Sequence, residues 1–268
     1  MGIFNPLEDY LIKYLSEYNE VDDTSGLEPR LAIRALMNIT KPDEIDYEFY
    51  EKQDKYLKGL LTEVALEKGE ELVEIEPHIA LYEGDITTLK VDAVVNPTNE
   101  TLEGSYVPLD ESVCSAILSF AGLQVRRDCM ELIKNQVEVE KAGGCKVTKG
   151  YNLPCEFIFH TVPPFVKDEL LDEDKETLKK CYLSCLKRAE HCDVKTIAFP
   201  VVLDDESNFP FKTSVKIAIN TVREYFDMNK QTKIEKVIFV LSNSYEYEIY
   251  EKTITNEISD FKLVRKFK

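Results

Sequence analysis

Apolar side chains recur every three or four positions through residues 7–64, and this spacing predicts amphipathic helices. Asn5 before Pro6 is typical of a helix start, because asparagine caps the first turn and proline fits a position that needs no amide donor. Gly69 is expected to end the last of these helices. The predicted helices cover residues 6–18, 30–39 and 47–68.

From residue 78 onward, short apolar runs alternate with longer segments of helical spacing. The run from Val91 to Val95 is nearly all apolar, which is typical of a strand covered on both faces. Strands are predicted at 78–83, 91–95, 145–149, 156–161, 195–200 and 235–241, and helices at 113–134, 175–190, 212–228 and 246–255. This alternation predicts an α/β fold of three layers, an α/β/α sandwich. We divide the chain into a helical extension at 1–75 and the sandwich at 76–268.

Polar residues stand where two of the predicted strands end. Gly84 permits a turn after the first strand, and Asp85 follows it with a carboxylate free to accept hydrogen bonds. Asn96 and Asn99 follow the second strand. Open α/β sheets bind ligands at the carboxyl ends of their strands, so these residues are candidates for ligand contacts. The alternative is structural, because aspartate and asparagine also satisfy amides in turns and loops.

Several segments together resemble the macrodomain family, and they follow in the family's order. They are LYEGDITTLKVDAVVNPTNETLEG (81–104), SYVPLDESVCSAILSFAG (105–122), QVRRDC (124–129), GGCKVTKGYNLP (143–154), FIFHTVPP (157–164) and IAFP (197–200). RALMNI (34–39) and QDKYL (53–57) resemble the helical extension of one branch. That branch is the zinc-containing macrodomains, ADP-ribosyl hydrolases associated with microbial sirtuins.

The resemblance implies a macrodomain sandwich with a mixed sheet, ADP-ribose as ligand and hydrolysis of ADP-ribose from proteins as the family activity. Asp85 resembles the aspartate that recognises the adenine amino group, and Ile86 the residue whose backbone fixes the ring. Asn99 resembles the asparagine that faces the distal ribose. Asn208 and Phe209 fall in the segment that resembles the phosphate-binding loop.

The chain departs from this branch at the zinc positions, where the family has Cys, His and Cys. Ser105, Asp110 and Ser112 stand there instead. Serine hydroxyls are poor zinc donors, so we expect no metal and no other cofactor. Without zinc, catalysis would need a water molecule oriented by Asp110, Asn99 or Cys114, and Asp110 and Asn99 are the two candidate catalytic residues.

The segment that resembles the phosphate loop, residues 201–210, carries three consecutive carboxylates at 204–206. All ten glycines lie at or before Gly150, so no glycine loop follows the later strands. Negative charge opposes a diphosphate, which backbone amides usually hold in a tight loop. Alternatively, the acidic side chains point into solvent and the amides still hold phosphate. Pro163 also replaces the family's glycine, and residues 242–244 lack the aromatic that related proteins place against the ligand.

Two functions therefore remain. In the first, the chain is related to protein-ADP-ribosyl hydrolases and recognises ADP-ribose or a related adenine nucleotide. Its zinc-dependent catalysis is lost, which would make it a pseudoenzyme. The second is a non-catalytic scaffold or protein-interaction module that no longer binds ADP-ribose. The expected partners are the nucleotide and an ADP-ribosylated protein, and whether the chain is an enzyme stays open.

Composition limits the partners further. The chain has 50 acidic and 33 basic residues and a net charge of -17, which repels nucleic acid. No apolar run approaches the roughly 20 residues that span a membrane. The N-terminus lacks a secretory signal, and seven irregularly spaced cysteines predict reduced thiols in a cytoplasmic protein. We expect Cys181 and Cys185 to pack in the core and His160 to be a satisfied histidine at a strand end.

Overall fold

The computed structural model describes residues 5–21, 24, 26–203 and 207–255, and a seven-stranded mixed sheet forms its centre. The inner strands run parallel, and antiparallel pairs close both edges. In spatial order the strands are β2 (Glu74–Glu76), β3 (Ile79–Glu83), β9 (Lys236–Leu241), β8 (Thr196–Pro200), β5 (Ala93–Pro97), β7 (Phe157–Thr161) and β6 (Cys145–Lys149). A separate pair joins β1 (Glu67–Lys68) to β4 (Leu89–Lys90).

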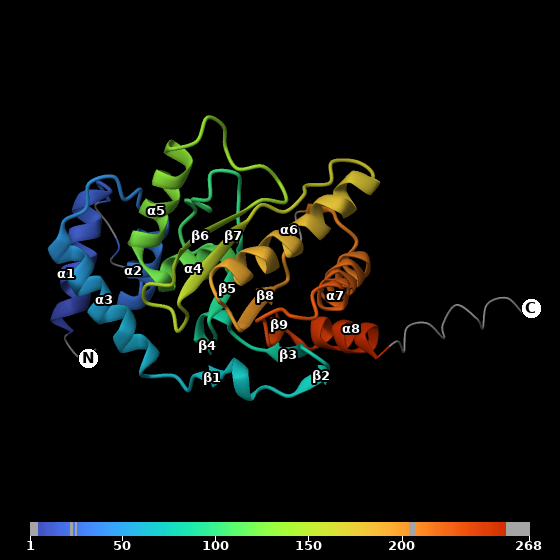
Figure 1. Ribbon diagram of the computed structural model, residues 1–268. Helices are drawn as coiled ribbons and strands as arrows, with labels where there is room; N and C mark the ends of the chain where they lie inside the picture. The colour runs from blue at the N-terminus through green and yellow to red at the C-terminus, as the bar shows by residue number, and fades with distance from the viewer. Residues whose placement is uncertain (1–4, 22–23, 25, 204–206, 256–268) are drawn as a thin grey trace, which may run out of the picture.

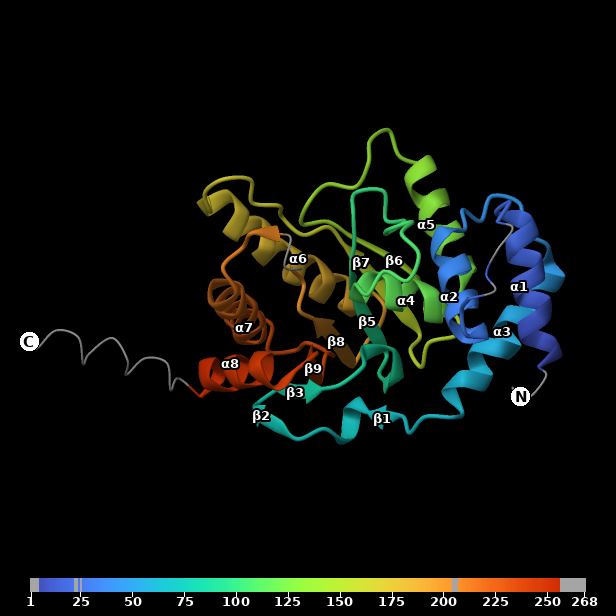
Figure 2. The same ribbon diagram turned by 180° about the vertical axis from the view of Figure 1, so that it is seen from behind.

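Helices cover both faces of the sheet (Figures 1 and 2). One face carries α6 (Asp172–His191), α7 (Phe211–Met228) and α8 (Ser244–Ile254), and the other carries α4 (Val113–Ala121) and α5 (Leu123–Lys134). In β9, Val237 and Phe239 pack toward α6–α8, whereas Ile238 and Val240 pack toward α4 and α5. This period of two, with both faces buried, confirms the predicted three-layer sandwich.

The N-terminal region adds three helices outside α4 and α5: α1 (Pro6–Tyr18), α2 (Pro29–Ile39) and α3 (Tyr47–Leu61). Their apolar faces form a cluster of their own, which reaches the sandwich through Leu123. The predicted helical extension is therefore present. The boundary at residue 75 stays a prediction, since β2 already pairs with β3 in the main sheet.

Arg126 on α5 fixes the extension to the sandwich. Only 2% of its surface is exposed, and its Nη1 donates to three carbonyl groups at the end of α2: Met37 at 3.1 Å, Asn38 at 2.7 Å and Thr40 at 2.9 Å. The last carbonyls of a helix have no partner within it, and the helix dipole places negative charge there. The buried cation therefore satisfies the end of α2.

A second polar contact joins the same units. The Asn38 side chain is fully buried, donates to the hydroxyls of Ser115 and Ser119 on α4 at 2.9 Å each, and accepts from the Leu109 amide at 3.1 Å. A buried amide that lost such partners would cost free energy. The contact thus fixes how α2 lies against α4.

Two predicted helices have different ends in the structure. The helix predicted at 47–68 ends at Leu61, and Gly69 lies further on in a short turn where an added Cβ would stand 2.5 Å from Val91 Cγ1. Glycine is needed there for close approach. The helix predicted at 113–134 breaks at Gly122, whose φ of +103° no helix adopts, giving α4 and α5.

No helix among the described residues is long and apolar enough to cross a bilayer.

Replacing Arg126 by alanine is expected to lower the free energy of unfolding by about 3 kcal/mol, because the carbonyls of α2 lose a charged donor inside the protein. Urea unfolding followed by circular dichroism measures it. Arg127→Ala is the matched control: Arg127 is partly exposed, lies 3.6 Å from Asp128, and its loss should cost less than about 1 kcal/mol. Equal losses in the two variants would contradict the role given to Arg126.

Candidate functional site

Five parallel strands end at one edge of the sheet, and the loops that follow them form the candidate site. Asp85 follows β3, Asn99 follows β5, residues 162–171 follow β7, residues 207–210 precede α7 after β8, and residues 242–243 follow β9. Ligands of open α/β sheets bind in the crevice at this edge.

Asp85 is exposed, and its carboxylate holds the turn after β3. Its Oδ1 accepts from the Thr87 amide at 2.8 Å and from the Thr87 hydroxyl at 2.7 Å. Ile86 is buried in the core between the sheet and α4, so only its backbone can meet a ligand. Asp85 therefore does satisfy donors of its own turn, as the structural alternative expected. Its contact with a ligand stays a prediction.

A cleft of about 300 Å³ lies beside Asp85 and is bounded by the extension. Leu60 and Tyr56 of α3 and Arg34 of α2 line it together with Asp85 and Phe120. The N-terminal helices therefore reach one flank of Asp85, the residue predicted to recognise adenine.

Two aromatic side chains that the sequence prediction missed lie at the same edge. Tyr245, in the first turn of α8, is 58% exposed and stacks on Phe211 of α7 with ring centroids 6.2 Å apart. The Gly84 amide bonds to the Leu241 carbonyl, so the turn with Asp85 and the loop before α8 are neighbours. An exposed aromatic side chain thus follows β9 at this edge of the sheet, although residues 242–244 are polar.

The signal for this ring was present in the sequence. Asn243 caps α8 by accepting from the Glu246 amide at 3.0 Å, while the Ser242 amide donates to the Glu246 carboxylate at 2.8 Å. Asparagine followed three residues later by glutamate is typical of a helix start. The prediction began this helix at 246 and therefore missed that Tyr245 belongs to its first turn.

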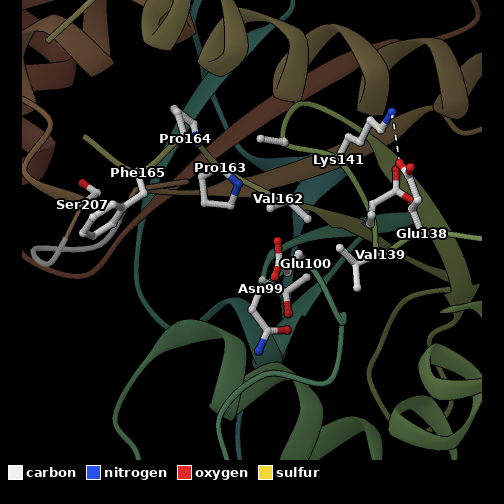
Figure 3. Close-up of a pocket in the computed structure, with 13 residues that line it drawn as sticks. Asn99, Glu100, Glu138, Val139, Lys141, Val162, Pro163, Pro164, Phe165 and Ser207 are labelled. Atoms are coloured by element: carbon white, nitrogen blue, oxygen red, sulfur yellow. Dashed lines mark ion pairs between the residues drawn. The ribbon is translucent and has the colours of Figure 1, made fainter. Parts of the chain in front are cut away.

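Asn99 lies at a second pocket, of about 710 Å³, formed with the loops after α5 and β7 (Figure 3). Its amide Nδ2 donates to the Gly104 carbonyl at 2.9 Å, and its Oδ1 accepts from the Thr101 hydroxyl at 3.0 Å. Asn99 therefore shapes the loop after β5 while remaining exposed at the pocket. Charged side chains also line the pocket: Glu100, Glu138, Glu140 and Lys141.

Asn96 lies within β5 and is fully buried. Its side chain lies 3.1 Å from His160 Nδ1, and the Thr148 hydroxyl lies 2.9 Å from His160 Nε2. Asn96 therefore has a structural partner in the sheet, and its ligand contact stays a prediction. The expectation of a satisfied His160 is confirmed, as is the burial of Cys181 and Cys185.

The three residues predicted to stand in place of zinc ligands use their side-chain oxygens within their own loop. Asp110 Oδ1 accepts from the Ser112 amide at 2.7 Å, Ser112 Oγ caps α4 by accepting from the Ser115 amide at 3.1 Å, and Ser105 Oγ accepts from the Val107 amide at 3.0 Å. Burial raises the pKa of Asp110, but hydrogen bonds from Ser112 and Ser105 and the charge of Arg34 outweigh it, so the pKa is lowered.

This donor set does not fit zinc, which needs thiolate, imidazole or carboxylate ligands in tetrahedral geometry. Within 5–21, 24, 26–203 and 207–255, no group of three His, Cys, Asp or Glu residues could hold a metal ion.

The segment after β8 contacts the segment after β7. Asn208 is exposed, adopts a φ of +54°, and donates from Nδ2 to the Val166 carbonyl at 3.2 Å. Phe209 is buried in the core under α6–α8. Their ligand contacts stay predictions, and the three carboxylates at 204–206 lie outside the described residues. The structure thus brings Asn99 and Ser207 to one pocket and places Asp85 at another.

Comparison with known proteins gives consistent results. A family model described as Macro domain matches residues 95–218. The protein-ADP-ribose hydrolase of Treponema medium is 31% identical over 259 residues, which cover 93% of this chain and 97% of that protein. The Trypanosoma brucei macrodomain in complex with ADP matches with a TM-score of 0.61 and 25% identity, covering 94% of this chain and 97% of its own. A variant of the Oceanobacillus iheyensis macrodomain with ADPR matches with a TM-score of 0.62 and 26% identity, covering 70% and 98%.

His160 should make the protein less stable in mild acid. Burial lowers its pKa from 6.5 to about 3, so between these values only the unfolded chain takes up the proton. The free energy of unfolding should therefore fall as pH drops through this window, by about 2 kcal/mol between pH 7.5 and pH 5. Since His160→Gln cannot titrate, the stability difference between parent and variant should shrink by that amount.

Urea unfolding at the two pH values measures this difference. His191→Gln, at the exposed end of α6, is the control and should keep the parent's pH dependence. A constant difference between parent and His160→Gln would show that the buried imidazole takes up its proton in the folded protein.

Proposed function

The chain belongs to the macrodomain family, and from that premise we propose that it binds ADP-ribose at the carboxyl edge of its sheet and has lost zinc-dependent hydrolysis. It is related to protein-ADP-ribose hydrolases over nearly its whole length. Two structural neighbours carry ADP and ADPR. An adenine-containing ligand is therefore the first molecule to test.

The adenine end of the site supports this proposal. The Asp85 carboxylate is exposed, and Oδ1 is the atom that accepts from Thr87, which leaves Oδ2 to accept from an amino group. Tyr245 and Phe211 form a stacked aromatic pair at the carboxyl edge of the sheet, where β9 ends next to the turn of Asp85. A purine needs both elements, an acceptor for its amino group and a flat apolar partner.

The loss of zinc-dependent hydrolysis rests on one observation. The side-chain oxygens of Ser105, Asp110 and Ser112 each accept a hydrogen bond from a backbone amide of their own loop. A metal there would have to break these bonds in exchange for two weak hydroxyl donors. Without the metal, Asn99 and Asp110 are the groups left to orient water at the distal ribose.

One observation favours the second function, a scaffold that does not bind ADP-ribose. Glu100, Glu138 and Glu140 line the pocket at Asn99, where negative charge would oppose a diphosphate. Two of the three are compensated, because Glu138 lies 3.4 Å from Lys141 and Glu140 lies 3.3 Å from Lys146. We therefore keep binding as the proposed function.

Calorimetric titration with ADP-ribose tests the proposal, and a Kd in the micromolar range is expected, on the order of -8 kcal/mol. Asp85→Ala should weaken binding about ten- to a hundredfold, since a hydrogen bond to a charged group contributes roughly 1.5–3 kcal/mol. Asp92→Ala is the matched control. Its carboxylate also accepts from backbone amides, those of Lys195 and Thr196 at 2.8 Å, but it precedes β5 at the opposite edge of the sheet.

Asp92→Ala should lose stability and keep the parent's affinity. An Asp85→Ala variant that binds as tightly as the parent would refute the assignment of the adenine site. Absence of heat with the parent protein would favour the scaffold.

Zinc should not bind the parent protein and should bind a variant with the family's ligands restored. Ser105→Cys, Asp110→His and Ser112→Cys combined supply two thiolates and an imidazole. Equilibrium dialysis followed by metal analysis should find about one zinc per variant chain and none per parent chain. A stoichiometric metal in the parent would overturn the proposed loss of zinc.

A further inference from the structure

Exposed apolar side chains flank the pocket at Asn99. Phe165, on the loop after β7, is 62% exposed, and Val139 and Val137, on the loop after α5, are 42% and 103% exposed. Figure 3 shows Phe165 and Val139 on opposite sides of the pocket, with Pro163 and Val162 between them. Clustered apolar groups at the mouth of a pocket are typical of a surface that binds another molecule.

The same loops are strongly acidic. The segment 97–112 contains no lysine or arginine, and the loops after α5 and β7 contribute only Lys141 and Lys167. Their carboxylates are Glu100, Glu103, Asp110, Glu111, Glu138, Glu140, Asp168 and Glu169. Lys141 is already 3.4 Å from Glu138. Among the described residues, the exposed carboxylates of Glu100 and Glu111 have no ion-pair partner within 4 Å, so this surface attracts cations and repels anions.

We propose that these residues, which we call the pocket rim (Val137, Val139, Phe165 and Glu100), dock a basic polypeptide segment next to its ADP-ribosylated side chain. The inference rests on the proposed function and specifies the class of ligand that it binds. Lysine and arginine side chains match the rim, because their aliphatic stems pack on apolar groups while their charged ends remain in solvent near carboxylates. Arginine can also stack on the exposed ring of Phe165.

The position of the rim fits this role. Asn99 is the residue predicted to face the distal ribose, and Glu100 follows it directly at the same pocket. A polypeptide attached to that ribose would leave the pocket past Glu100 and lie between Phe165 and Val139. A nucleic acid or an anionic membrane would meet the same carboxylates with like charge.

The test uses two synthetic peptides of equal length, each with one ADP-ribosylated side chain, flanked by lysine and arginine in one and by aspartate and glutamate in the other. Fluorescence anisotropy of the labelled peptides, with free ADP-ribose titrated separately, gives three affinities for the full chain. The basic peptide should bind about tenfold more tightly than ADP-ribose, and the acidic one more weakly than the basic one. Because the rim is exposed, the advantage should decrease with added salt.

The ratio of basic-peptide affinity to ADP-ribose affinity separates the contribution of the rim to binding from that of the pocket. Glu100→Lys and Phe165→Ser should each reduce this ratio several-fold. Glu51→Lys and Tyr47→Ser are matched controls on α3; Glu51 is also exposed, Tyr47 is 77% exposed, and neither should change the ratio.

The outcomes separate the two proposals. Failure of free ADP-ribose to bind would refute the proposed function. If ADP-ribose binds but the two peptides bind equally, or the acidic peptide binds more tightly, the proposed role of the pocket rim is refuted. The proposed function would not be affected by that result.

Discussion

The buried guanidinium of Arg126 is the interaction on which the arrangement of the whole chain depends. It neutralises the carbonyl end of α2, donates to the Ser105 carbonyl at 3.2 Å, and lies 4.7 Å from the Tyr106 ring. One side chain of the sandwich thus fixes the N-terminal helices and the start of the loop before α4. A buried cation is costly unless it is hydrogen-bonded, and here, among the described residues, Nη1 and Nη2 make all the bonds while the buried Nε makes none, so this geometry tolerates little displacement of the elements around it.

The same constraint shapes the site. Arg34 on α2 donates to the Asp110 carbonyl at 3.1 Å, so the loop from Ser105 to Ser112 is held at both ends by arginines and within by its own hydroxyls and carboxylate. The sequence resemblance to zinc-containing macrodomains predicts that a loop in this position supplies metal ligands. Here protein hydrogen bonds can fix its shape without a metal, which is why we favour ligand recognition over zinc chemistry. The loop is next to the pocket at Asn99, whose rim faces solvent with apolar and acidic groups.

Much of the fold could be predicted from the sequence, because strands buried on both faces leave runs such as Val91–Val95, and helices leave three- and four-residue spacing. The break at Gly122 was missed since apolar spacing continues on both sides of it, and only contacts with distant residues such as Gln53 explain the glycine. Local pattern predicted that Asp85 and Asn99 follow strands. It also offered hydrogen bonds within turns as the structural alternative for both, but it could not show that the two residues lie at different pockets, because that depends on how separate loops pack.

We propose that an adenine site survives beside a loop that holds no metal. A crystal structure of the protein grown with both ADP-ribose and zinc tests it most directly. We predict the adenine within hydrogen-bond distance of Asp85 and unchanged bonds from the Ser112 amide to Asp110. Tetrahedral zinc bound at Asp110, or ADP-ribose bound away from Asp85, would contradict it.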